Sequence, residues 1–158
     1  MDIKRRICHE AGHAVAALHF GLCVERVEVF RGMPRTLIDL KCGTRESMIV
    51  LASGIAAEQF IFSNYDSEAC GSDQKTISEY GGGAIQDLLH EAMPVIRSHE
   101  ACLGQMRAQL TKRWVGCQAE CEAASNFDAD SNSLTFELLS HHEIYHQCSE
   151  FGQGARSK

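Results

Sequence analysis

The sequence lacks a hydrophobic run that could cross a membrane, and it lacks an excess of basic residues. Its longest nearly continuous apolar run covers residues 48–57 and is interrupted by Ser53 and Gly54, which leaves it far short of the roughly 20 residues that span a bilayer. Lys and Arg number 15 against 21 Asp and Glu, so the electrostatic footprint of a nucleic-acid-binding protein is missing. We therefore expect neither a membrane nor a nucleic acid as a partner.

A secretory signal, internal repeats and low-complexity tracts are lacking as well. The charged start of the chain runs directly into a helical pattern instead of the hydrophobic region of a signal peptide. Eight cysteines in 158 residues are too few for the stapled scaffold of a small secreted protein. The sequence therefore predicts a cytoplasmic protein with reduced thiols. The cysteines expected to serve as small core side chains are Cys8, Cys23, Cys42 and Cys102.

Length and composition are those of one soluble domain. The chain is 44% hydrophobic and 23% charged, and 158 residues are enough for one sizeable core but not comfortably for two. We predict a single domain over residues 1–150 and a disordered tail over residues 151–158.

Hydrophobic periodicity and turn residues predict an α+β fold that is predominantly α-helical. An opening helix is expected from Asp2, its N-cap, to Phe20, with Gly21 as its stop. Residues 24–31 and 36–42 are predicted as the strands of a hairpin or small sheet. The other predicted elements are a turn at residues 32–34, helices over residues 44–62, 72–80, 84–114 (bent near Pro94) and 133–147, and a mixed segment over residues 116–132.

The opening helix contains the pattern His9-Glu10-Ala11-Gly12-His13. Residues four apart lie on one face of a helix, so His9 and His13 can present two imidazole nitrogens to one metal ion. Glu10 lies about 100° round the helix and is placed to take a proton from metal-bound water without being a ligand. Gly12 costs roughly 1 kcal/mol relative to alanine in a helix interior, which predicts a close approach by another backbone. The pattern as a whole predicts a zinc peptidase.

A catalytic zinc needs a third protein ligand, with the fourth position open to water. His19 is the residue that the longer metzincin pattern would use. That pattern has a glycine where this chain has Ala16, so the helix continues and His19 points away from the other two histidines. We expect His19 to be an ordinary, partly exposed histidine, and the third ligand to come from elsewhere.

Three short segments follow one another along the chain: residues 9–14 (His-Glu-Ala-Gly-His-Ala), 53–59 (Ser-Gly-Ile-Ala-Ala-Glu-Gln) and 67–73 (Ser-Glu-Ala-Cys-Gly-Ser-Asp). In order and approximate spacing they resemble the peptidase domain of the FtsH family of membrane-tethered, ATP-dependent zinc proteases. The resemblance covers about residues 3–77 and continues more loosely through the later helices. It implies a zincin-like peptidase domain with a small β-hairpin or sheet beside the His-Glu-x-x-His helix.

The resemblance also implies a ligand set. In that family the aspartate matching Asp73 is the third zinc ligand, which implies a Zn²⁺ site of His9, His13 and Asp73 with Glu10 as the catalytic base. Taken from the residues alone, Asp73 is by default a helix N-cap or a partner of the helix dipole. Glu58 also matches a family position, and it is either a solvated carboxylate or a group that orients a ligand.

The chain departs from the family in the modules that use ATP. Its residues contain no Gly-x-x-x-x-Gly-Lys-Ser/Thr loop, and we expect no membrane anchor. Ser53 and Ile55 replace a glycine and an arginine of the family's second segment, and three glycines at residues 81–83 interrupt the region after Asp73. We expect a peptidase without its own ATPase, which acts on unfolded or flexible chains or works with a separate ATPase or adaptor.

A second His-Glu-x-x-His pattern occurs at residues 142–146. Polar residues surround it and no third-ligand segment follows it, so we interpret it as a solvated helix end. A structural zinc site is the alternative for this region. Its ligands would be Cys117 and Cys121 together with His142, His146 or Cys148.

The sequence therefore predicts a zinc-dependent endopeptidase that hydrolyses polypeptides through a metal-activated water. One of the two predicted strands is expected to hold an extended peptide by backbone hydrogen bonds. Two alternatives from other classes stay open. One is an inactive peptidase-like domain that binds a partner as an adaptor or inhibitor, and the other is a small protein whose zinc is purely structural and has four protein ligands.

Overall fold

The computed structural model describes residues 2–30, 33–41, 43–67, 70–80, 83–125 and 135–148. The predicted α+β, mostly helical class is confirmed over these residues, and none of their helices is long and apolar enough to be a bilayer span. The predicted tail at residues 151–158 lies outside them. In chain order the elements are α1 (Ile3–His19), β1 (Val24–Phe30), β2 (Met33–Ile38), α2 (Arg45–Phe62), α3 (Gly71–Glu79), α4 (Ile85–Ser98), α5 (Glu100–Ser125), β3 (Thr135–Ser140) and α6 (His141–Gln147).

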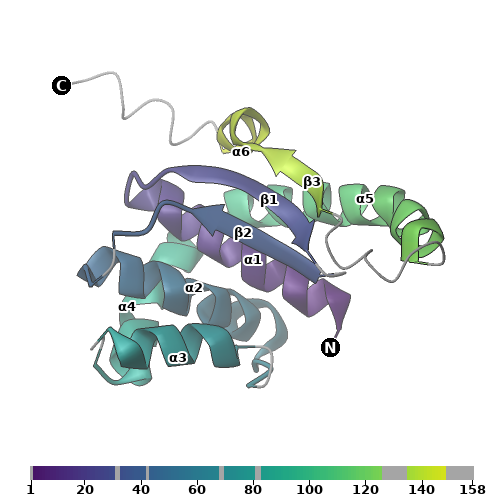
Figure 1. Cartoon of the computed structure of the whole chain (residues 1–158). Coiled ribbons are helices and arrows are strands. Elements are labelled where there is room, and N and C mark those ends of the chain that lie inside the picture. Colours follow the sequence, from purple (N-terminus) through teal and green to yellow (C-terminus); the bar gives the residue numbers. More distant parts are fainter. Residues whose placement is uncertain are drawn as a thin grey trace.

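Helix α1 passes through the middle of the molecule, with the sheet on one side and α2 and α4 on the other (Figure 1). It begins as predicted, because the side chain of Asp2 accepts a hydrogen bond from Lys4 N at 2.9 Å. Residues 7–18 are all buried. A helix that is apolar nearly all round can be covered on every side, and this position places the His-Glu-x-x-His pattern inside the protein.

Helices α1 and α2 pack closely because both carry glycine where they meet. A Cβ atom on Gly12 would lie 2.5 Å from the backbone oxygen of Ser53 and 2.7 Å from Cβ of Ala57. The close backbone approach predicted for Gly12 is therefore confirmed. Helix α2 begins as expected, since Thr44 caps it by accepting a hydrogen bond from Ser47 N.

The three strands form an antiparallel sheet in the order β2-β1-β3. The hairpin of β1 and β2 was predicted, but β2 begins at Met33 and includes Pro34, which lies opposite Val29. The prediction of a turn there is wrong for these two residues. Proline is compatible with this place because β2 pairs with β1 along one side only among the described strands, and an edge strand does not need the missing N–H.

The predicted helix over residues 133–147 is wrong in its first half. Residues 135–140 form β3, which pairs with β1, and only residues 141–147 are helical. A short stretch containing Leu138 and Leu139 is consistent with either structure, and pairing with a distant strand decides between them. Ser140 then starts α6 with a capping box, in which its side chain and that of Glu143 each bond the other's backbone.

The predicted helix over residues 84–114 is two helices that meet at His99. Pro94 lies inside α4, whereas the break comes five residues later, where α4 ends and the carbonyl of His99 accepts from Leu103 N at the start of α5. Helix α5 also runs through Gly116 to Ser125, in the segment expected to be mixed. The remainder of that segment lies outside the described residues.

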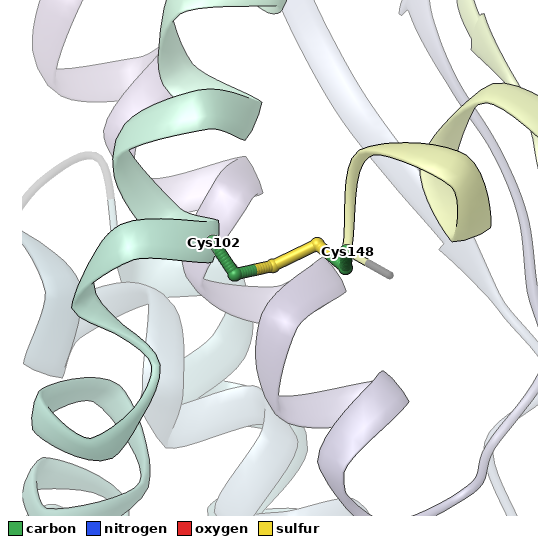
Figure 2. Close-up of a disulfide and its surroundings, with 2 residues drawn as sticks. All are labelled: Cys102 and Cys148. Atoms are coloured by element: carbon green, nitrogen blue, oxygen red, sulfur yellow. A yellow bond between two sulfur atoms is a disulfide. The ribbon is translucent and has the colours of Figure 1, made fainter. Parts of the chain in front are cut away.

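A disulfide joins Cys102 of α5 to Cys148, directly after α6 (Figure 2). The prediction of reduced thiols is therefore wrong for this pair. The two cysteines are 46 residues apart in the chain, and the spacing of cysteines in a sequence does not show which of them pair. Of the other cysteines expected in the core, Cys8 is a buried free thiol and Cys23 is exposed. Cys42 lies outside the described residues.

Candidate metal centre

His9 and His13 direct their Nε2 atoms towards the same carboxylate. His9 Nε2 lies 2.7 Å from Asp73 Oδ2, and His13 Nε2 lies 3.3 Å from the same oxygen. His9 and His13 lie one turn apart on α1, and Asp73 lies in the first turn of α3. Two imidazole nitrogens and a carboxylate oxygen thus converge from segments about sixty residues apart in the chain, and they could hold a metal ion.

The opposite ring nitrogens are both occupied. His9 Nδ1 lies 2.8 Å from Glu58 Oε1, and His13 Nδ1 lies 2.8 Å from the backbone oxygen of Val50. Both acceptors belong to α2. With a hydrogen held on Nδ1, Nε2 is the ring nitrogen that can bind a metal ion, once the metal replaces any proton that Nε2 shares with Asp73.

Glu58 is a fixed, buried group. It also accepts a hydrogen bond from Asp66 N at 3.1 Å, and its side chain is only 1% exposed. Of the two roles that the sequence left open for Glu58, a solvated carboxylate is ruled out by its burial, and its contact with His9 is one that can orient the imidazole.

The ionisable groups of this cluster shift one another's pKa values. Burial by itself raises the pKa of the Asp73 carboxyl, but the charges and hydrogen bonds of His13 and His9 hold that pKa well below its ordinary value. Burial by itself lowers the pKa of His9, and hydrogen bonds to Asp73, Cys70 and Glu58 outweigh it, so the pKa of His9 lies well above its ordinary value. The negative carboxylates therefore favour positive charge at this point in the structure.

Helix α2 passes close to the two imidazoles at Gly54. A Cβ atom on Gly54 would lie 2.6 Å from His9 Nε2 and 2.7 Å from His13 Cε1. Glycine at this place in α2 leaves room for both rings to face Asp73. Together with the two held Nδ1 atoms, it makes the residues present compatible with a bound divalent metal.

A second group, His9, Glu58 and Cys70, could also hold a metal ion. The Cys70 sulfur lies 3.7 Å from His9 Nδ1 and 3.6 Å from Glu58 Oε1. Its three atoms lie on the far side of the His9 ring from Asp73, and two of them already form the His9–Glu58 hydrogen bond. We therefore interpret this group as the support of the first, with burial raising the pKa of the Cys70 thiol and keeping it neutral.

Glu10 lies beside the candidate centre and is held by two neighbours. Its Oε2 accepts from Thr36 N at 2.6 Å, and its Oε1 lies 2.8 Å from Arg6 Nη2. Glu10, His13 and Asp73 all line one pocket of about 240 Å³, which continues along β2. The predicted base thus shares a cavity with two of the predicted ligands.

The edge of β2 nearest α1 is already bonded to α1. Thr36 N donates to Glu10, Thr36 Oγ1 donates to the backbone oxygen of Glu10, and the carbonyl of Pro34 accepts from Arg6 Nε at 3.1 Å. A peptide could pair with β2 at these two residues only by displacing Arg6 and Glu10. A strand was expected to hold an extended substrate by its backbone. At Pro34 and Thr36 the backbone groups of β2 that would do so are already hydrogen-bonded within the protein.

Several other candidates from the sequence lie away from the centre. His19 contacts His99 at 3.0 Å near the far end of α1. In the second His-Glu-x-x-His, Glu143 bonds Ser140 and Arg113, while both histidines are exposed. Of the residues of the alternative structural zinc site, the sulfur of Cys148 is bonded to Cys102, and neither group of described residues that could hold a metal contains Cys117, His142 or His146. The side chain of Cys121 is not described.

Four contributors were not predicted from the sequence. Arg6 stands four residues before Glu10, and this helical spacing of opposite charges was a usable signal. Gly54 stands within the small-residue run of α2, whose close packing against another helix was a second signal. Val50 acts through its backbone carbonyl and Thr36 mainly through its backbone N–H, and side-chain identity carries no signal for either.

Comparison with known proteins adds no relative: no protein-family model matches the chain, and no curated protein matches it with significant similarity. The site geometry is therefore what supports a function.

Proposed function

We propose that this protein is a zinc-dependent endopeptidase that hydrolyses peptide bonds in unfolded or flexible polypeptides. The observation that carries the proposal is the convergence of His9 and His13 Nε2 on Asp73, with Glu10 lining the same pocket. The resemblance of three segments to the FtsH peptidase domain supports the same reading, and the proposed ligand set is the one it implies.

Zinc is the metal that this donor set favours. Two imidazoles and one carboxylate with an open position are typical of catalytic zinc, whereas structural zinc has four protein ligands. Among the described residues, no fourth ligand atom completes the group of His9, His13 and Asp73. This composition weighs against a purely structural metal.

In the proposed mechanism, each residue has one task. A bound zinc ion would supply a Lewis acid and lower the pKa of a water molecule towards about 7. Glu10 accepts the proton of the attacking water and passes it to the leaving amine. Glu58 and the Val50 carbonyl hold the two imidazoles in the tautomer that exposes Nε2, and Arg6 and Thr36 hold Glu10 at the pocket.

The pocket sets the kind of substrate. At about 240 Å³ it can receive a side chain or a short length of chain, but not a folded domain. We therefore propose that the substrate is presented as a loose polypeptide, if necessary by a separate ATPase or adaptor.

The deciding experiment compares the wild type with Glu10→Gln, using metal analysis and cleavage of a permanently unfolded protein. We expect both proteins to contain about one zinc ion and only the wild type to cleave. Because they lack a ligand, His9→Ala and Asp73→Ala should lose both zinc and cleavage. Equal cleavage by Glu10→Gln would remove Glu10 from the mechanism, and undiminished zinc affinity in Asp73→Ala would remove Asp73 from the ligands.

One observation favours a second candidate, a peptidase-like domain that binds polypeptide without cutting it. Both oxygens of Glu10 are held, by Arg6 and by Thr36 N, so Glu10 also serves as a link between α1 and β2. In that case zinc-loaded wild type would bind unfolded polypeptide without cleaving it, and Glu10→Gln would be less stable but equally inactive.

We propose the cytoplasm as the working compartment, as the sequence favours, and the disulfide is the observation that tests this. Cys8, Cys23 and Cys70 are free thiols, whereas Cys102 and Cys148 are bonded, and disulfides are rare in the cytosol. Thiol trapping at the moment of cell lysis, followed by mass spectrometry, measures how much of the pair is bonded in the cell, and a largely reduced pair would support the cytoplasm. A fully oxidised pair would point to an oxidising compartment.

A further inference from the structure

Arg35 lies at the rim of the pocket, on β2 and close to the candidate centre. It lines the same cavity as Glu10 and Asp73, and its side chain is 39% exposed. No step of the proposed hydrolysis uses it. A charged side chain that borders the cavity and is open to solvent is in a position to contact whatever enters.

Two contacts fix the orientation of the Arg35 guanidinium. Its Nε donates to Glu28 Oε1 at 2.7 Å, and its Cζ lies 3.8 Å from the centre of the Phe30 ring. Nη2 also faces Glu28, at 2.5 Å, whereas Nη1 has no hydrogen bond within the part of the chain that the structure describes. A guanidinium held in this way loses little conformational freedom when it binds a further acceptor.

Arg35 is not needed merely to neutralise Glu28. The buried Glu28 carboxylate also accepts from Arg26 Nε at 2.7 Å, so two guanidinium groups share one carboxylate. Arg26 has a second acidic neighbour, Glu25, at 3.9 Å, and it does not line the pocket. The unbalanced positive charge therefore lies on the side of Arg35.

Along this part of β2, a polypeptide substrate would have to be bound mainly by side chains. The Thr36 N–H and the Pro34 carbonyl are already bonded to α1, which leaves less of the backbone for a substrate. Guanidinium groups bind carboxylates through charge-assisted hydrogen bonds, often two in parallel, which are about twice as strong as hydrogen bonds between neutral groups.

We propose that Arg35 is a specificity-determining residue that binds a carboxylate of the polypeptide, so that the site prefers acidic substrates. This inference rests on the proposed peptidase function, because it takes the pocket to be the place where a polypeptide binds. The carboxylate belongs either to an Asp or Glu side chain or to the C-terminus of the substrate, and the chemistry at Arg35 is the same.

The test measures binding as well as cleavage. Short fluorescein-labelled peptides that differ only in Glu, Gln or Lys at one scanned position, each with a free or an amidated C-terminus, are titrated with zinc-loaded Glu10→Gln protein. We expect the best Glu peptide to bind about tenfold more tightly than its Gln counterpart, the order of one charge-assisted hydrogen bond. If instead Glu and Gln peptides bind equally and amidation weakens both to a similar degree, the terminal carboxylate is the group recognised.

Arg26 provides the matched control. Arg35→Ala should reduce the ratio of Glu to Gln affinity to about twofold or less, and Arg26→Ala, which disturbs the same carboxylate, should leave the ratio unchanged. In Arg35→Ala the buried Glu28 carboxylate keeps only Arg26 as a partner, and this variant could fold poorly for that reason. The double variant Arg35→Ala with Glu28→Gln removes that buried charge and provides the same test. Arg35→Lys should retain part of the preference.

The outcomes separate this inference from the proposed function. Equal binding of all the peptides, whatever the residue at the scanned position and whether or not the C-terminus is amidated, would overturn the role of Arg35 even if the wild type cleaves neutral peptides. An equal loss of the preference in Arg26→Ala and Arg35→Ala would overturn it as well. Conversely, an Arg35-dependent preference in a wild type that cleaves nothing would support the carboxylate site while refuting the peptidase.

Discussion

At the scale of single residues, His9 is the most constrained side chain of the candidate centre. One ring nitrogen lies 2.8 Å from a Glu58 oxygen and the other 2.7 Å from an Asp73 oxygen, and the ring is 1% exposed. An imidazole with a carboxylate behind it is a better electron donor and cannot rotate away. The affinity of the site for zinc should therefore depend on Glu58, even though Glu58 is not a proposed ligand.

Replacing Glu58 tests this dependence. In Glu58→Ala the zinc affinity should fall by roughly 10- to 100-fold, because His9 loses the acceptor that fixes its tautomer and orientation. Competition with a chelating dye measures the affinity, and Glu46→Ala, an exposed carboxylate on the same helix, is the control. Wild-type affinity in Glu58→Ala would mean that the Glu58–His9 contact is unimportant for the metal.

Glu28 gives a second prediction, on stability against pH. Burial by itself raises the pKa of Glu28, but hydrogen bonds from Arg26 and Arg35 bring that pKa below its ordinary value of 4.5. A carboxyl whose pKa is lower in the folded state stabilises the fold above pH 4.5, and this contribution disappears as the pH falls through the folded-state pKa. Glu28→Gln should therefore be less stable than the wild type at pH 7, by about 1.5–3 kcal/mol.

Urea unfolding followed over a pH series checks this expectation. The difference between the wild type and Glu28→Gln should shrink steadily below pH 4.5. A difference that stays constant down to strongly acidic pH would show that the charge of Glu28 is not what stabilises the sheet.

At the scale of elements, the crossing of α1 and α2 builds the candidate centre. Gly12 lets the two backbones touch, and Gly54 leaves room for the two imidazoles. The crossing also places Val50 and Glu58 behind His13 and His9. Packing and site assembly therefore depend on two different glycines of one interface.

The two glycines should respond differently to substitution. In Gly12→Ala the new Cβ meets backbone atoms of Ser53, so the helices must separate and we expect a loss of about 1–3 kcal/mol of stability. In Gly54→Ala the new Cβ meets the imidazoles, and zinc affinity should fall more than the thermal midpoint does. Calorimetry and dye competition on both variants check the contrast, and zinc binding by Gly54→Ala at wild-type affinity would contradict it.

The elements that the sequence predicted well are those whose signals are local. Asp2 and Thr44 were recognisable caps, and the spacing of His9 and His13 was sufficient to expect a shared metal face. β3 was missed because it is specified by pairing with β1, more than a hundred residues earlier. Asp73 needed a family resemblance to be selected, since nothing in its own neighbourhood distinguishes a ligand from a helix cap.

At the scale of the whole molecule, the C-terminal elements are attached to the body in two ways. β3 pairs with β1, and the Cys102–Cys148 disulfide ties the end of α6 to α5. Neither cysteine belongs to the groups that could hold a metal. Stability and the candidate chemistry should therefore be separable in this part of the protein.

Removing the disulfide tests that separation. A loop of 46 residues is closed by the bond, and its loss in Cys102→Ser with Cys148→Ser should lower the free energy of unfolding by roughly 2–4 kcal/mol. Zinc affinity should stay within about twofold of the wild type, because the bond does not contact the ligands. Cys23→Ser, at an exposed free thiol, is the control, and a parallel loss of zinc would show that the two regions are coupled.

The bonded edge of β2 has a consequence for the protein in concentrated solution. Unpaired strand edges are templates on which other chains add, and they are a common origin of aggregation. At Pro34 there is no N–H to offer, the Pro34 carbonyl is held by Arg6, and the Thr36 N–H is held by Glu10. The same helix that carries the candidate metal ligands thus shields this stretch of sheet from sticking to a second molecule, and loosening the Arg6–Glu10 pair should expose it to self-association.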